Sequence, residues 1–306
     1  MSETILVTDS LFIFNEHIKK LKAAGYEVER LDKPKASEDE LIQAIKGKVG
    51  YILGGIEKVT PKVLEAADKL RAIAFTGADW QALIPGWETA HKKGIKISNT
   101  PGSNATAVAE YAMAIALAMQ RNIFELGRGG QKTFETTGSI QDAVVGIVGM
   151  GDIGQKLIAQ AKAFDPKQIV YWSKHKKDVE AGFLDLPKLI KSSNIIFVAV
   201  AGAADNLLNE ALINLAKSSA LIVSISPLNV MDMGALLKRL KAGTLRAAID
   251  WPAPSPAFDQ LPRNIWYNSN DHTAYNTFPA NQLASDWATV SIINLLQTGE
   301  DSHRVL

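Results

Sequence analysis

Short apolar runs alternate with amphipathic segments along the first hundred residues. The apolar runs predict buried strands, and the segments between them carry apolar residues at helical spacing. Ser37 with Glu40 fits a capping box, and Thr60 before Pro61 fits the start of another helix. This repeated alternation predicts a parallel sheet with helices on both faces. The expected strands are 4–8, 26–31, 50–53, 72–75 and 95–97, and the expected helices lie near 18–24, 41–45, 64–70 and 87–92.

A second region of the same kind follows a break at Asn99-Thr100-Pro101-Gly102. An Ala-rich helix over about 106–121 leads into it, and a final helix over about 281–296 is expected to pack back on the first region. The sequence thus predicts an α/β protein with two doubly wound parallel-sheet domains. The expected strands are 144–148, 168–172, 195–200, 220–224 and 245–249, the expected helices 186–190, 210–215 and 232–241, and a helix-free loop is expected over 251–256.

Gly149, Gly151 and Gly154 lie between an apolar strand and a helix, in G-x-G-x-x-G spacing. The first glycine permits a tight turn, the second lets the backbone approach a pyrophosphate, and the third allows close helix–strand packing. The unpaired N–H groups of the new helix then face the phosphates. A plain glycine turn is the alternative, but the order of strand, glycines and helix favours dinucleotide binding.

Composition excludes several classes of function. A net charge of +1 gives no overall attraction to nucleic acid or an anionic membrane. The chain has no cysteine, so it has no disulfide, thiol nucleophile or cysteine metal site, and we expect no metal. The longest apolar stretch, 105–119, contains Glu110 and is short for a membrane span, and no signal peptide is evident. We therefore expect a cytoplasmic protein with a small-molecule substrate.

Several motifs together resemble the D-isomer-specific 2-hydroxyacid dehydrogenases, which include phosphoglycerate dehydrogenases and glyoxylate/hydroxypyruvate reductases. They are 99–102, Val108-Ala109-Glu110, the glycine turn and His272-Thr273-Ala274. The resemblance implies a flavodoxin-like substrate domain, 1–100 plus 283–306, with an inserted Rossmann domain, 101–282. It also implies a homodimer, for which the Ala-rich helix would suit the two-fold interface.

The resemblance implies roles for single residues as well. His272 would be the catalytic acid that protonates a carbonyl or imine during hydride delivery, with a hydrogen-bonded loop histidine as the alternative. Backbone N–H groups at Gly54, Gly55 and Gly77 would hold a substrate anion, unless these are turn glycines. The implied cofactor contacts are Gly149, Gly151, Asp152, Ile153, Gly154, Ser173, Lys174, His175, Lys176, Ala201, Ser224, Ile225, Asp250 and His272.

The first departure from the family concerns the cofactor. The family usually ends its second nucleotide-domain strand with an acid that binds the ribose 2′-OH. Here Ser173 stands there, and Lys174-His175-Lys176-Lys177 follow. A carboxylate would repel a 2′-phosphate, whereas a hydroxyl and ammonium groups bind one. We expect NADP(H) to be preferred over NAD(H), with an ordinary solvated charge run as the alternative.

Two further departures concern catalysis. The family's catalytic arginine falls on Pro227-Leu228, and the run 224–229 has no basic residue. The family's orienting glutamate falls near Ser255, and no carboxylate occurs between Asp250 and Asp259. His272 is therefore expected to lack an acidic partner and to be a weaker proton donor.

These observations predict an NADP(H)-dependent oxidoreductase that transfers hydride to a carbonyl or imine of a small molecule other than a standard 2-keto acid. One alternative is a conventional 2-hydroxyacid dehydrogenase with a relocated carboxylate-binding residue. The other is a non-catalytic NADP-binding sensor or pseudoenzyme, which intact glycines beside altered catalytic positions would also fit.

Overall fold

The chain divides into two compact units. The computed structural model describes residues 2–8, 13–33, 35–129 and 136–306. Unit 1 comprises Met1–Asn104 and Asn276–Leu306, and unit 2 comprises Ala105–Tyr275. The boundaries lie near, but not at, the expected positions 100/101 and 282/283.

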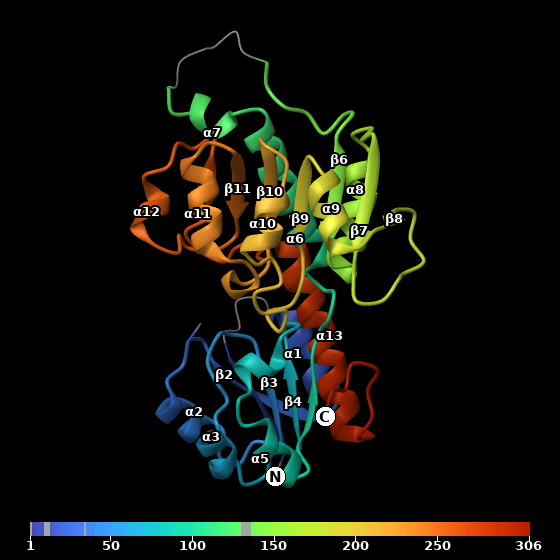
Figure 1. The fold of residues 1–306 in the computed structure, drawn as a ribbon. Helices are drawn as coiled ribbons and strands as arrows, with labels where there is room; N and C mark the ends of the chain where they lie inside the picture. Colours follow the sequence, from blue (N-terminus) through green and yellow to red (C-terminus); the bar gives the residue numbers. More distant parts are fainter. Residues whose placement is uncertain (1, 9–12, 34, 130–135) are drawn as a thin grey trace. The chain divides into compact units, whose positions relative to one another are not determined.

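Unit 1 is a five-stranded parallel sheet with helices on both faces (Figure 1). Its strand order β2-β1-β3-β4-β5 is the flavodoxin-like order, which confirms the predicted fold class for this unit. Its elements are β1 (Glu3–Thr8), α1 (Asn15–Ala23), β2 (Tyr26–Leu31), α2 (Glu38–Ala44), β3 (Gly50–Leu53), α3 (Pro61–Ala66), β4 (Ala72–Phe75), α4 (Trp80–Leu83), α5 (Trp87–Lys92), β5 (Lys96–Ser98) and α13 (Phe278–Gln297).

Local sequence signals set the ends of several of these helices. The Ser37–Glu40 capping box forms as predicted, and Thr60 caps α3 with Pro61 in its first turn. The prediction that α3 runs to Leu70 is wrong. The backbone turns extended at Ala67, and the following segment buries Leu70 in the core instead of adding a helical turn.

Unit 2 is a seven-stranded parallel sheet with the order β12-β11-β10-β9-β6-β7-β8 (Figure 1). This is the doubly wound Rossmann order with one more strand at the end, as predicted for the fold class. Its elements are α6 (Ala105–Gln120), α7 (Ile123–Leu126), β6 (Val144–Val148), α8 (Asp152–Lys162), β7 (Gln168–Trp172), β8 (Gly182–Phe183), α9 (Leu186–Ser192), β9 (Ile195–Val198), α10 (Glu210–Leu215), β10 (Ala220–Ser224), a 3-10 turn (Leu228–Val230), α11 (Met233–Lys241), β11 (Leu245–Ile249), α12 (Pro256–Asp259) and β12 (Trp266–Asn268).

Each face of the unit 2 sheet has its own hydrophobic core. Along β9, Ile195 and Phe197 pack on the face that α6 and α8 cover, while Ile196 and Val198 pack on the opposite face. Because both faces are buried, the central strands are apolar throughout instead of alternating. Most of α6 is buried within this core, so few of its side chains remain for a contact with another subunit.

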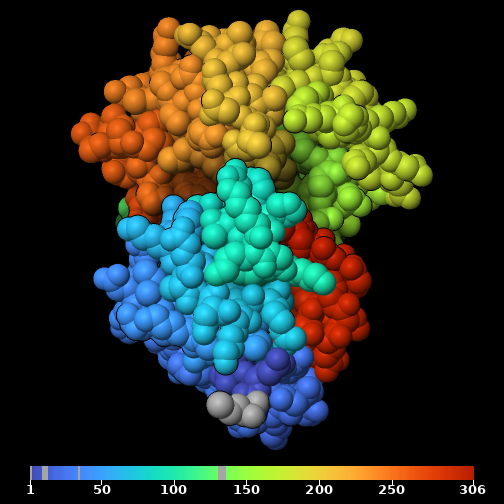
Figure 2. Space-filling model, turned by 90° about the horizontal axis from the view of Figure 1, so that it is seen from below, coloured from blue at the N-terminus to red at the C-terminus, as the bar shows by residue number. Residues whose placement is uncertain are grey.

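The segment after α13 covers an edge of the unit 1 sheet. It runs antiparallel beside β5, where Val305 N–H donates to Ile97 O over 2.8 Å and Asn99 N–H donates to His303 O over 3.2 Å. In Figure 2 this red segment lies against residues of the first hundred, although the two are far apart in the sequence. The contact removes the open edge that would otherwise invite pairing with another strand.

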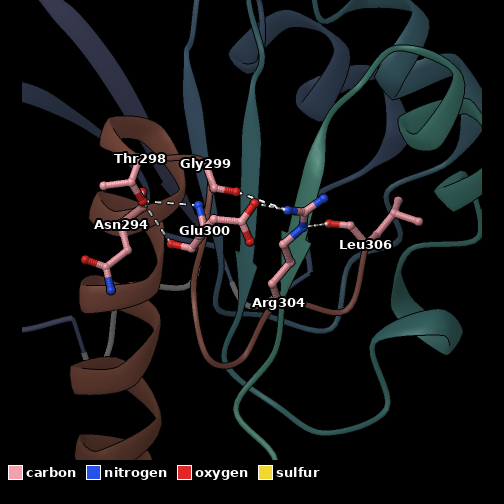
Figure 3. A network of polar contacts seen from close by, with 6 residues as sticks. All are labelled: Asn294, Thr298, Gly299, Glu300, Arg304 and Leu306. Atoms are coloured by element: carbon pink, nitrogen blue, oxygen red, sulfur yellow. Dashed lines mark hydrogen bonds and ion pairs between the residues drawn. The ribbon is translucent and has the colours of Figure 1, made fainter.

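Polar side chains hold this segment in place. Arg304 donates to Gly299 O over 3.2 Å, to Glu300 Oε1 over 2.8 Å and to Leu306 O over 3.0 Å (Figure 3). Asp301 is more deeply placed, with 2% of its side chain exposed. Its donors are Ser291 Oγ, Asn294 Nδ2 and His303 N–H, at 2.8, 2.9 and 2.8 Å.

Asp301→Ala is expected to lower the free energy of unfolding of unit 1 by about 2–4 kcal/mol, because it leaves three donors without their acceptor. Glu300→Ala is the matched control. Glu300 is 76% exposed, so losing its ion pair with Arg304 should cost at most about 1 kcal/mol. Urea denaturation of both variants measures the difference, and equal losses would contradict the assigned role of Asp301.

Candidate functional site

The glycine turn joins β6 to α8 at the point where the strand order of unit 2 reverses, between β6 and β9. Gly149 has φ +105°, and a Cβ there would overlap the carbonyl oxygen of Ala199. A Cβ on Gly154 would overlap the carbonyl oxygen of Gly149. A Cβ on Gly151 would meet no atom within 4 Å, so open space lies before this residue. The turn therefore has the shape that a pyrophosphate requires.

The N-terminus of α8 offers the hydrogen-bond donors for such a group. No side chain caps the helix at Gly151, and Asp152 and Ile153 form its first turn. The first N–H groups of a helix have no partner within the helix, and they carry its positive dipole end. The predicted contacts from 149 to 154 thus lie together in the structure and fit a bound dinucleotide.

The loop after β7 carries the predicted ribose-binding residues. The Tyr171 hydroxyl accepts from Lys177 N–H over 2.8 Å and donates to Lys177 O over 2.7 Å, which closes the loop onto its strand. Ser173 is half-buried and donates to His175 O over 2.6 Å. Lys174, His175 and Lys176 are exposed, and in the part of the chain that the structure describes these lysines make no ion pair.

The ends of β9 and β10 carry no positive charge. Ala201 is exposed, while Ser224 and Ile225 are buried, and their role in cofactor binding stays a prediction. Asn229 donates its amide to Gly202 O over 2.7 Å and to Asp205 Oδ1 over 3.0 Å. The site where the family places its arginine is thus filled by Pro227 and by hydrogen bonds from Asn229 to the loop 202–205, none of which brings a positive charge.

His272 lies beside the end of β11. Its Nδ1 is 3.0 Å from Asp250 Oδ2 and 3.2 Å from the backbone oxygen of Asp250. The Asp250 side chain is fully buried, whereas 40% of the His272 side chain is exposed. Thr273 N–H and Ala274 N–H donate to the two carboxylate oxygens over 3.2 and 2.9 Å, which ties the histidine turn to the strand.

The expectation that His272 lacks an acidic partner is wrong. The family pattern places the acidic partner in the loop 251–256. In this structure the carboxylate belongs to Asp250, which follows the last residue of β11 and precedes that loop. Burial lowers the pKa of His272, but the hydrogen bonds and negative charge of Asp250 outweigh it, so the pKa of His272 lies above its ordinary value. The negative charge of Asp250 therefore stabilises the protonated form of His272, which persists to higher pH than in an isolated histidine.

Aromatic rings surround this pair. The Trp251 indole stacks on the His272 ring, with ring centres 4.3 Å apart and an interplanar angle of 8°. The ring of Tyr275 is tilted by 47° relative to the ring of His272, and the two ring centres are 5.5 Å apart. Trp251 lies in the loop 251–256, for which no helix is expected from the sequence. The last residue of that range differs from this expectation: Pro256 begins α12, because proline is tolerated in the first turn of a helix.

The predicted substrate glycines of unit 1 differ in their surroundings. Gly54 N–H donates to Thr8 Oγ1 over 3.4 Å and Gly55 is buried, whereas Gly77 is half-buried. Their role in substrate binding stays a prediction.

A buried polar cluster next to Gly54 was not predicted. Thr8, the last residue of β1, and Tyr51, within β3, both donate to the carboxylate of Glu57, and the Tyr51 bond measures 2.9 Å. Burial and the nearby carboxylate of Glu57 raise the pKa of Tyr51 well above its ordinary value, so its hydroxyl keeps its proton. The strand order reverses between β1 and β3, which is where ligands bind on such sheets. Sequence patterns gave no sign of it, because Glu57 lies in a loop.

Comparison with known proteins identifies the family. Residues 112–270 match the D-isomer specific 2-hydroxyacid dehydrogenase, NAD binding domain. Glyoxylate reductase of Thermococcus litoralis is 31% identical over 243 residues, which cover 73% of this chain and 72% of that protein. This chain belongs to the D-isomer specific 2-hydroxyacid dehydrogenase family.

Solved structures agree. The TT0316 protein of Thermus thermophilus has a TM-score of 0.85 and 26% identity, covering 99% of this chain and all of that one. An acyclic imino acid reductase (Bsp5), solved in complex with NADPH and D-Arg, has a TM-score of 0.83 and covers 99% of this chain and all of that one. The two sequences are 21% identical, so this comparison supports the fold alone.

As a member of the D-isomer specific 2-hydroxyacid dehydrogenase family, the chain is an NAD(P)-dependent oxidoreductase. Among the described residues, no group of three His, Asp or Glu side chains is placed to hold a metal ion. No helix in the described ranges is long and apolar enough to cross a membrane.

Gly151→Ala is expected to fold normally but to bind NADPH at least about 10-fold more weakly, because its methyl group would enter the space left for the pyrophosphate. Gly151 has φ −82°, which alanine adopts without strain. Gly149→Ala should lose thermal stability as well, since it adds a clash and a strained φ. Melting temperatures and NADPH fluorescence titrations separate the two effects. Normal NADPH binding by the Gly151 variant would exclude the turn as the pyrophosphate site.

Proposed function

We propose that this family member is a reductase that prefers NADP(H) to NAD(H) and acts on a carbonyl or imine of a small molecule other than a standard 2-keto acid. The observation that carries the proposal is the loop 224–229, which holds Pro227 and a neutral asparagine link where the family has its arginine. A site without this cation forfeits a charge-assisted contact with a substrate carboxylate.

Each group of predicted site residues has a role in the proposed reaction. The glycine turn and the first turn of α8 would hold the pyrophosphate, and Ser173 with Lys174 and Lys176 would hold the 2′-phosphate. Bound NADPH supplies the hydride, which reduces the C=O or C=N carbon. His272 donates the proton from Nε2 to the oxygen or nitrogen of that bond, giving an alcohol or an amine.

The imino acid reductase of the same fold was solved with NADPH, but the proposal rests on the residues of this chain.

The homodimer and the cytoplasmic location stay predictions. Because α6 is largely buried, exposed apolar residues for a subunit contact are found instead on α7, where Ile123 is 54% and Leu126 is 45% exposed.

Ser173→Asp is expected to weaken NADPH binding about 10-fold or more through repulsion of the 2′-phosphate, while NADH binding changes little. Fluorescence titration of both cofactors against parent and variant measures this. Ser218→Asp is the control, because it adds the same charge at an exposed position before β10, at the amino end of the parallel strands, whereas Ser173 follows the carboxyl end of β7. A parent enzyme that binds NADH as tightly as NADPH would contradict the proposed preference.

Glyoxylate, hydroxypyruvate and pyruvate are expected to be poor substrates, with kcat/KM below about 10⁴ M⁻¹s⁻¹. Pro227→Arg should raise kcat/KM for these acids, and Pro227→Gln, of similar length without charge, should not. Steady-state assays with NADPH test all three proteins.

High parental activity on these acids would mean that another residue binds the carboxylate, as in a conventional 2-hydroxyacid dehydrogenase. NADPH binding without turnover of any carbonyl or imine in a broad panel would instead indicate a sensor.

A further inference from the structure

We propose that Asp250 is the residue that orients His272, in place of an acid from the following loop, and that Trp251 fixes the plane of the histidine ring. The inference rests on the proposed function only in that His272 delivers the proton. Asp250 and Trp251 are positioning residues, because they act on the substrate through His272.

The contacts at Nδ1 determine which nitrogen carries the proton. Both neighbours of Nδ1, the Asp250 carboxylate at 3.0 Å and the Asp250 backbone oxygen at 3.2 Å, are acceptors. Nδ1 must therefore donate, and in the neutral ring its proton resides there. Nε2 is then the nitrogen that takes up a proton from solvent and gives it to the substrate.

The carboxylate is held firmly enough to impose this arrangement. Its two oxygens accept from Thr273 N–H and Ala274 N–H, so the group cannot rotate without breaking backbone hydrogen bonds. With His272 it uses three of about four acceptor positions, and the side chain is fully buried. This geometry favours a contact with His272 over the direct cofactor contact that the family resemblance implies for Asp250.

Trp251 acts on the other degree of freedom, rotation of the ring. An indole 4.3 Å from the imidazole and parallel to within 8° covers one face of it. Such a stack opposes rotation of the ring and favours the protonated form through a cation–π interaction. The loop after β11 thus contributes an aromatic wall instead of a carboxylate.

The other titratable groups near the pair do not compete for this role. Asp271 acts on His272 through its charge, and Tyr275 contacts the ring. Tyr111 is hydrogen-bonded with Tyr267 and Ser269, and its pKa is raised by burial first, then by Tyr267 and the charge of Asp250. The raised pKa keeps the Tyr111 hydroxyl protonated, and the carboxylate in direct contact with Nδ1 is that of Asp250.

The first test uses the unmodified protein and needs no substrate. Nitrogen-15 NMR of the histidine side chains reports which ring nitrogen is protonated. The chain has five histidines, and His272→Gln assigns the signal by its loss. We expect neutral His272 to carry its proton on Nδ1. A proton on Nε2 in the neutral ring would overturn the proposal, whether or not the proposed substrate class is correct.

The second test compares Asp250→Asn with Asp271→Asn, which removes the neighbouring charge without touching Nδ1. On a substrate found by the panel, Asp250→Asn should lower kcat about 10- to 100-fold, a part of the roughly 10²–10⁴-fold that a general acid supplies. The pKa of His272 should fall, so the loss of activity with rising pH begins at lower pH. NADPH affinity should stay within about 3-fold of the parent, because Asp250 acts on the histidine. Asp271→Asn should keep parental kcat.

A large loss of NADPH affinity in Asp250→Asn with an unchanged pKa of His272 would show that Asp250 contacts the cofactor, and would overturn the proposal. Trp251→Leu and Trp251→Phe test the stack separately. Phenylalanine retains a flat ring, so kcat should fall less in Trp251→Phe than in Trp251→Leu. Equal losses of kcat in the two variants would exclude ring stacking as the way in which Trp251 acts on His272.

Discussion

A buried carboxylate that needs partners organises the chemistry of unit 2. Asp250 lies at the end of a strand whose neighbours on both sides are also buried, so water does not satisfy its oxygens. An unpaired carboxylate there would cost several kcal/mol, and the chain meets this demand with backbone donors of the turn 273–274 and with His272. The position of the histidine is therefore a consequence of satisfying the strand end.

The residues that depart from the family pattern change the distribution of charge over the site. The site lacks the family's arginine at Pro227, and an aspartate next to His272 replaces the glutamate. The histidine–aspartate pair is neutral overall when the histidine is protonated, so it leaves no excess positive charge to attract a carboxylate. The basic residues are instead collected in the loop after β7. In the proposed function, positive charge therefore lies at the end of the site assigned to the cofactor ribose and not at the end assigned to the substrate.

Much of the fold was predictable because both faces of each sheet are buried. Strands such as 144–148 and 195–198 contain no polar side chain. The short strands β8 and β12 escaped prediction, since two or three residues show no periodicity. The glycine turn was recognisable because its spacing falls between an apolar strand and a helix. Asp250 was not recognisable as the partner of His272, because the two residues are separated in the sequence and the family pattern places the acid in the loop that follows Asp250. Asp250 at a strand end was the one available signal.

The composite make-up of unit 1 affects how the protein is made. Ala288, Ile292, Leu295 and Leu296 complete a core whose other buried members come from the first hundred residues. Unit 2 lies between these two parts of the chain and is continuous in sequence. On the ribosome, unit 2 is able to fold while the first strands still expose one apolar face. At about 5–20 residues per second this interval lasts roughly 10–40 s. Nascent chains of this protein consequently present a specific, long-lived target for the chaperones that shield apolar sheet surfaces during synthesis.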